Sequence, residues 1–375
     1  MVTSVDSLLT DSLDTMTGGD LTDIRDALRR RGMSVREAAR RTQYDPAYLS
    51  RALNGRQPAS PALLASLRSV LGFDEPAYDG PATPSGSTEY VRSAVAHFLE
   101  HDRRHGGDHV VDAALQVWRS EQRKLDRVVA PTRDRISAVA EIAEVAGWVA
   151  FDADRRADAR QALMESAALA RSAGDRPLQW FATDLRAMAA IQYGAPGEAI
   201  RLVDEITDHP SLPPRVALLS RIRRARALAM AGDRARSLDL IERATGGLQD
   251  SLTPRDPGWA WWVDSVEITG HRGEVLLSLG EADKALPHLR HARFASAESG
   301  RGHLYYSVAE LTALVDARAW PECAEVLEVI HEELHHVSSA RSRGRLAGTL
   351  RRLTDAAPAP VVRAGRDVEE LLRAA

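Results

Sequence analysis

The sequence predicts an all-α protein in which a small basic head precedes a long α-solenoid of stacked helical hairpins. Apolar residues recur at three- and four-residue spacing along most of the chain, which is the pattern of amphipathic helices. No segment alternates apolar and polar residues between hairpin turns, as a half-buried strand does. Glycine-containing breaks divide the helical pattern into similar pairs of segments. The length of 375 residues suffices for two domains.

The charge of the chain is unevenly distributed. The formal net charge is -4, but residues 20–72 contain ten arginines and five acidic residues, whereas residues 73–375 contain 39 basic and 45 acidic residues. A basic segment on a mildly acidic body suits phosphate contact at one end only. Cys323 is the only cysteine, which excludes an intrachain disulfide and a cysteine-based zinc finger. With no signal-peptide pattern and no long apolar run, we expect a cytoplasmic, nucleoid-associated protein without membrane contact.

Composition predicts four regions in chain order. Residues 1–19 are small, polar and acidic, and we expect a disordered tail. Residues 20–72 hold four helical segments and form the predicted head. Residues 73–89 contain three prolines and two glycines with little to bury, which predicts a linker. Residues 90–375 form the predicted repeat body, with sensor and oligomerisation roles.

The stretch from Ser34 to Ser60 predicts two short helices that cross at a tight turn. Ser34 can cap a first helix over 35–42, and Glu37 completes a capping box. After a break at 42–44, Asp45 can cap a second helix with Pro46 in its first turn. This second helix ends at Asn54-Gly55, where glycine favours a left-handed stop. The pattern predicts a helix-turn-helix that reads DNA.

The second helix of this pair would present its outer face to a major groove. Leu49 and Leu53 face inward, and Arg51 on the other face can bind a guanine edge with two hydrogen bonds. Other polar and basic residues would contact phosphate or sugar. The open alternative is a helical hairpin with a solvated, arginine-rich face. The predicted DNA-binding residues are Ser34, Arg36, Gln43, Tyr44, Pro46, Ala47, Tyr48, Ser50, Arg51, Asn54 and Arg56.

The pattern S-x-x-E-A-A-x-x-T-x-x-x-P-x-x-L-S-R-x-L-N-G-x-x-x-x-S, which runs from Ser34 to Ser60, resembles the lambda-repressor-like (XRE) family. With the repeats and the phrases AEVAGWVAFDA and PGWAWWVD, residues 20–355 look like an actinobacterial XRE regulator with a C-terminal tetratricopeptide-repeat domain. The resemblance implies a four- to five-helix head, base reading by Pro46, Ala47, Ser50 and Arg51, and effector sensing by the repeats. Gln43 departs from the glycine that is usual in the family's turn.

The repeat body shows a recurring local pattern. Segments 187–206, 225–244 and 273–292 each combine a small-residue helix, a short glycine turn and a second helix rich in alanine and leucine. The turns are 38 and 48 residues apart, and the longer spacing includes an inserted loop at 250–258. Because each helix pair buries one face only by stacking on its neighbours, we expect four to six pairs across residues 135–355.

One helix of the body carries an acidic stripe beside aromatic residues. Such a face could bind a cationic or peptidic effector, which could be a peptide, a small molecule or a segment of a partner protein. Alternatively, the stripe pairs with arginines of the preceding helix (Arg221, Arg223, Arg224 and Arg226) and the tryptophans fill the repeat core. The predicted effector-binding residues are Trp262, Asp264, Glu267, His271, Glu274 and Tyr305.

Two histidine patterns suggest metal chemistry. His331-Glu332-x-x-His335 matches the H-E-x-x-H zinc motif, so a zinc metallohydrolase is a remote alternative, although no convincing third ligand follows. Histidines also recur every four residues from His97 to His109, a spacing that could serve metal binding or pH sensing. The sequence contains no glycine-rich phosphate-binding loop and no nucleophile elbow. Because these catalytic motifs are missing, we expect a protein that is not an enzyme and holds no cofactor.

Together these features predict a transcription regulator that reads a pseudo-palindromic double-stranded operator as a homodimer. The alternative is a repeat scaffold for protein partners whose head tethers it weakly and nonspecifically to DNA.

Overall fold

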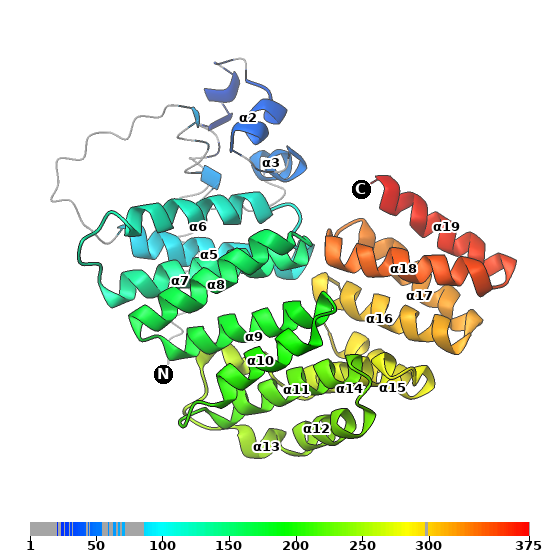
Figure 1. Cartoon of the computed structure of the whole chain (residues 1–375). Coiled ribbons are helices and arrows are strands. Elements are labelled where there is room, and N and C mark those ends of the chain that lie inside the picture. Colours follow the sequence, from blue (N-terminus) through cyan, green and yellow to red (C-terminus); the bar gives the residue numbers. More distant parts are fainter. Residues whose placement is uncertain are drawn as a thin grey trace, which may run out of the picture.

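The computed structural model describes a protein whose regular elements are all helical within the part of the chain that it covers (Figure 1). The all-α prediction is confirmed. The predicted tail at 1–19 and residues 73–85 of the predicted linker lie outside the described residues. The described residues are 21, 24–25, 27–29, 31, 33–42, 44, 46–54, 59, 63–64, 67, 70–71, 86–296 and 299–374.

The head contains the predicted helix pair. Helix α2 (Val35–Thr42) and helix α3 (Pro46–Leu53) pack through buried Ala39 and Leu49. The hydroxyl of Ser34 accepts a hydrogen bond of 3.1 Å from the backbone N–H of Glu37, as the capping prediction requires. The Glu37 carboxylate instead accepts a hydrogen bond from Arg41, so only half of the capping box forms. Asp45 and Gly55 lie outside the described residues.

The body is an α-solenoid of seven successive helix pairs along the described chain; six pairs pack directly, whereas both helices of the first pair pack mainly on the first helix of the second pair. It begins at Gly86, inside the segment predicted as linker. The first helices of the pairs are α5 (Gly86–His105), α7 (Arg133–Asp152), α9 (Arg176–Gln192), α11 (Pro214–Met230), α14 (Ser265–Ser278), α16 (Arg301–Ala317) and α18 (Ala340–Ala356). The second helices are α6 (Val111–Leu125), α8 (Arg156–Ala173), α10 (Pro196–Thr207), α12 (Arg234–Gly246), α15 (Ala282–Ala295), α17 (Trp320–Leu334) and α19 (Ala359–Ala374).

An insertion between α12 and α14 interrupts the alternation. It contains the short helix α13 (Leu248–Ser251) and a 3₁₀ helix, η1 (Gly258–Trp262), so the segment predicted as a loop is partly helical. The glycine turns are as predicted: Gly194, Gly232 and Gly280 adopt φ of +75°, +81° and +74° after the first helices of their pairs. None of the helices in the described ranges is long and apolar enough to cross a membrane.

The solenoid curves until its ends meet, with α5 beside α16 and α7 beside α18 (Figure 1). We call this junction the clasp and define it by the buried ion pairs Asp102–Arg301 (2.9 Å) and Asp152–Arg341 (3.1 Å), with the turn at Gly106. Gly106 has φ +77°, and a Cβ there would lie 2.3 Å from the carbonyl oxygen of Ser338. Only glycine lets the two ends approach this closely. The closed curve places the first helices around a common centre.

Candidate functional site

The head presents part of its predicted DNA-binding set at the surface. Ser34, Arg36, Pro46 and Asn54 are exposed, and Ser50 and Arg51 are half-buried on α3. Ala47 and Tyr48 belong to α3, but their side chains, like the whole of Gln43 and Arg56, lie outside the described residues.

Tyr44 is a correction to the predicted interface. Its side chain is only 5% exposed and packs with the apolar residues of the head, including Leu49. The tyrosine follows the end of α2, and its ring closes the core at the turn between the helices. A buried ring is not presented to a DNA backbone, so Tyr44 is a core residue of the head.

The head and the body share one apolar core. Leu49 and Leu53 of α3 belong to the same buried cluster as Val95 and Phe98 of α5. Burial lowers the pKa of His101 on α5 to about 3, and the nearby charges, Arg51 among them, contribute to this shift. Arg51, predicted to read bases, therefore lies within electrostatic range of α5.

The centre of the curved body holds a cavity of about 460 Å³. Its wall comes from η1 and from the first helix of every pair, whereas the second helices contribute none of the lining residues. A volume of this size suits a drug-sized ligand. Aromatic side chains form a large part of the lining: Trp148, Phe151, Phe181, Trp259, Trp261, Trp262, Tyr305 and Tyr306.

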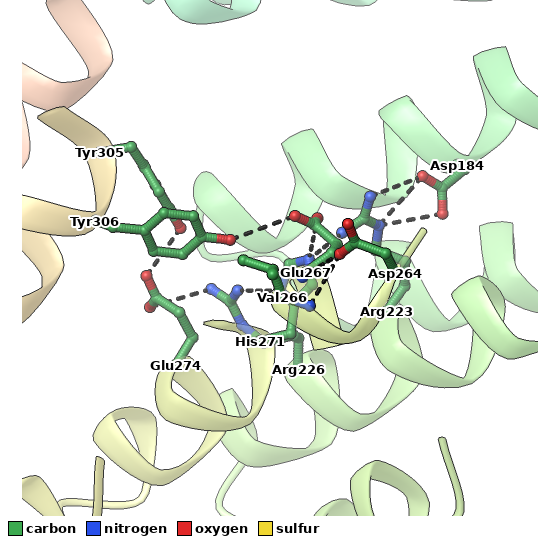
Figure 2. A network of polar contacts seen from close by, with 10 residues as sticks. All are labelled: Asp184, Arg223, Arg226, Asp264, Val266, Glu267, His271, Glu274, Tyr305 and Tyr306. Atoms are coloured by element: carbon green, nitrogen blue, oxygen red, sulfur yellow. Dashed lines mark hydrogen bonds and ion pairs between the residues drawn. The ribbon is translucent and has the colours of Figure 1, made fainter. Parts of the chain in front are cut away.

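One side of the cavity, which we call the paired wall, is formed by α11, α14, α16 and α18 and carries a dense polar network (Figure 2). Arg223 donates to Asp184 at 2.9 Å, and both side chains are buried. Glu274 accepts from Tyr305 at 2.8 Å and from Arg345 at 2.6 Å, and it also pairs with Arg226. Burial opposes ionisation of Glu274, but the two arginines hold its pKa well below the ordinary value.

His271 is held in the same network as a neutral ring. Its Nδ1 lies 2.9 Å from a donating nitrogen of Arg226, and its Nε2 lies 2.9 Å from the Glu267 carboxylate. Its Nε2 also lies 2.9 Å from a nitrogen of Arg223, so an arginine contacts each nitrogen of the ring. Burial lowers the pKa of His271, which agrees with this neutral form. The hydroxyl of Tyr306 donates to the second oxygen of Glu267 at 3.3 Å.

The predicted effector residues divide into two groups. Trp262, Glu267, His271, Glu274 and Tyr305 all line the cavity. Asp264 does not, because its carboxylate caps α14 by accepting from the backbone N–H groups of Val266 and Glu267, each at 2.9 Å (Figure 2). The prediction for Asp264 is wrong: an aspartate directly before a helix start is an N-cap.

The structural alternative for the acidic stripe is also borne out in part. Arg223 and Arg226 pair with the stripe or its neighbours, whereas Arg224 pairs with Asp204 on α10. Trp259 stacks on Phe181 at 4.6 Å between ring centroids and donates its N–H to the carbonyl of Pro177. Trp261 remains 75% exposed. The stripe is thus neutralised, and the aromatic residues both pack and line the cavity.

A second side, which we call the apolar wall, is formed by α7 and α9 and contains a carboxyl that the sequence prediction missed. Glu144 is 5% exposed and lines the cavity one turn before Trp148. No described residue forms a hydrogen bond or ion pair with it. Burial, and secondarily the charge of Glu141, raises the pKa of Glu144 to about 8. Its signal in the sequence is a single charged residue in the apolar run 142–151.

The histidine patterns do not assemble into a metal centre. Helix α17 ends at Leu334, so His335 lies beyond its last residue, and the Glu332 side chain is 80% exposed. His97, His101 and His105 follow one another along α5, and His109 lies after its end. Within the described ranges, no three histidine, cysteine or acidic side chains are arranged to hold a metal ion.

Comparison with known proteins identifies the head. Residues 24–78 match the family model of a helix-turn-helix domain, which contains both α2 and α3. No curated protein and no solved structure shows significant similarity to the chain. The resemblances to the XRE family and to tetratricopeptide repeats stay predictions. A helix-turn-helix domain implies DNA as a partner of this chain.

Proposed function

We propose that the chain is a sequence-specific transcription regulator whose head reads a pseudo-palindromic operator as a homodimer and whose body binds an effector in the central cavity. The observation that carries the proposal is the match of residues 24–78 to a helix-turn-helix domain, on a segment with a packed α2–α3 pair. The local excess of arginine supplies the electrostatic grip that DNA binding needs.

Within the head, α3 is the recognition helix of the proposal. Arg51 supplies the main base contact, with Ser50 beside it and exposed Pro46 at the start of the helix. Arg36 of α2 is exposed and serves as a phosphate contact. Two heads in a homodimer would then read half-sites about one helical turn apart.

Helix α5 contacts both the cavity and the head. Its Phe98 packs in the cluster that includes Leu49 of α3, and its neighbours Leu99 and Asp102 line the cavity. A ligand that contacts the cavity side of α5 can therefore alter the packing or position of the head. This supports a regulator in which cavity occupancy sets DNA affinity.

The test is selection of binding sites from random double-stranded DNA with the purified full chain. We expect enrichment of one pseudo-palindromic sequence. Arg51→Ala should lower affinity for this sequence by about 1–3 kcal/mol while random-DNA affinity changes little. The exposed Arg243→Ala on the outer helix α12 is the matched control and should change neither.

Absence of any enriched sequence, or equal loss on selected and random DNA in Arg51→Ala, would contradict the proposal and favour the repeat scaffold. The proposal also assigns no catalytic activity to the chain. Stoichiometric zinc in the purified protein that is lost in His331→Ala would contradict that part.

A further inference from the structure

We propose that the central cavity binds a small organic cation, an ammonium group on an apolar or aromatic body, with its positive charge against the Glu144 carboxylate. This inference names the chemical class of the effector and so rests on the proposed function. Glu144 lines the cavity, is 5% exposed and has no hydrogen-bonding or ionic partner among the described residues.

The other charged groups of the cavity are already ion-paired or hydrogen-bonded. Each arginine in the lining has a carboxylate partner, so an anionic ligand would have to displace an existing ion pair. The pairs are Arg103–Glu100, Arg223–Asp184, Arg226–Glu274, Arg301–Asp102 and Arg341–Asp152. Glu274 has a second arginine in Arg345, and Glu267 is bonded by His271 and Tyr306. Glu144 is the unmatched group, and its chemistry calls for a cation or a hydrogen-bond donor.

The apolar part of the ligand has a suitable surface in the same cavity. Phe181 stacks on Trp259, and Trp262 lies 6.2 Å from Phe181 and 6.4 Å from Trp259 between ring centroids. These three rings line the cavity together with Leu185 and Met188 of the apolar wall. Aromatic faces bind both flat apolar groups and organic cations. A carboxylate and such rings in one cavity favour an ammonium compound with an apolar body.

The protonation of Glu144 adds a pH signature to this site. Burial raises the pKa of Glu144 to about 8, so without a bound cation Glu144 is a neutral acid near pH 7. A bound cation favours the carboxylate, and binding should therefore release a proton. Glu141 on α7 contributes to the raised pKa. The titratable and charged groups that face the cavity from the other helices are Asp102, Arg103, Arg223, Arg226, Glu267, His271, Glu274, Arg301, Tyr305, Tyr306 and Arg341.

The experiment is calorimetric titration of the full chain with benzyltrimethylammonium, phenethylammonium and the neutral 2-phenylethanol. We expect the two cations to bind at least about tenfold more tightly than the alcohol, which corresponds to one charge-assisted contact. Glu144→Gln should remove this preference. Glu141→Gln, one turn earlier on α7 and outside the cavity lining, should keep it.

Circular dichroism and thermal unfolding of both variants establish that they are folded. Equal affinity for the cations and the alcohol, an unchanged preference in Glu144→Gln, or no binding of either cation at millimolar concentration would overturn the inference. The titration contains no DNA, so its result is independent of whether the head selects a sequence. If no DNA sequence were enriched but the cations still bound, the proposed regulator function would be refuted, whereas the proposed cation site would be supported.

Discussion

The paired wall and the apolar wall of the cavity handle buried charge in opposite ways. On the paired wall, Glu274 is buried against two arginines and a tyrosine hydroxyl. On the apolar wall, Glu144 is equally buried but has no partner among the described residues. A polar network whose groups are all hydrogen-bonded fixes the arrangement of its helices. Burying a carboxyl without a partner costs free energy, and a ligand that pairs with the carboxyl lowers this cost. The paired wall therefore stabilises the shape of the cavity, and the apolar wall is suited to binding a ligand in it.

The largest expected effect comes from breaking the buried ion pair between Asp184 of α9 and Arg223 of the paired wall. Asp184→Ala leaves Arg223 buried at 1% exposure without its carboxylate, which should lower the free energy of unfolding by about 3–5 kcal/mol. Denaturant unfolding measures the change. The control is Asp204→Ala, whose partner Arg224 is partly exposed, with an expected loss under about 1 kcal/mol. Similar losses in the two variants would show that the buried pair has no special role.

The apolar wall should make stability depend on pH. Because the pKa of Glu144 is raised in the folded protein to about 8 from 4.5, the folded state holds this proton more tightly than the unfolded chain. Stability from this group is therefore complete below pH 4.5 and falls as pH rises to about 8, by a few kcal/mol in all.

Glu144→Gln should remove that dependence, so the variant gains stability relative to the natural chain between pH 5 and pH 8. Urea unfolding at several pH values measures the difference between the two proteins. His97 and His101, whose pKa values burial lowers to about 4 and about 3, titrate in both proteins and cancel in the difference. A difference that stays constant with pH would mean that Glu144 is not a buried neutral acid.

A smaller effect is expected at the clasp, which brings the two walls together. Gly106→Ala places a Cβ 2.3 Å from the Ser338 carbonyl oxygen, whereas Gly232→Ala has the same positive φ and nothing within 4 Å. Both variants carry backbone strain, so the excess loss in Gly106→Ala, about 1–3 kcal/mol, reports the closed junction. Small-angle scattering should show a larger radius only for Gly106→Ala. Equal stability and size would contradict closure.

Local features of this fold were predictable from sequence because they depend on neighbouring residues. The Ser34 cap, the α2 and α3 bounds and the positive φ of Gly232 follow from short-range preferences. Asp264 could have been identified as a cap by the same rule, since it directly precedes α14. Glu267, His271 and Glu274 line the cavity from one helix, as their spacing predicts.

Closure of the solenoid was not predictable, because it depends on partners far apart in the chain. Asp102 and Arg301 are separated by 199 residues, and His105 accepts from the backbone N–H of Ser338 across a similar span. From the sequence, Glu144 is a glutamate in an alanine-rich helix, and nothing near it in the chain indicates that it is buried. Its burial and lack of a partner follow from which helices surround it, and repeat periodicity does not specify that arrangement.

The most direct test of the account is the dissociation constant for the selected DNA site, measured with and without a saturating organic cation that binds the cavity. We predict a change of at least about fivefold for the natural chain, which is the range of ordinary allosteric coupling, and none for Glu144→Gln. The same affinity in both conditions, with the cavity shown to be occupied, would contradict control of the head by the cavity.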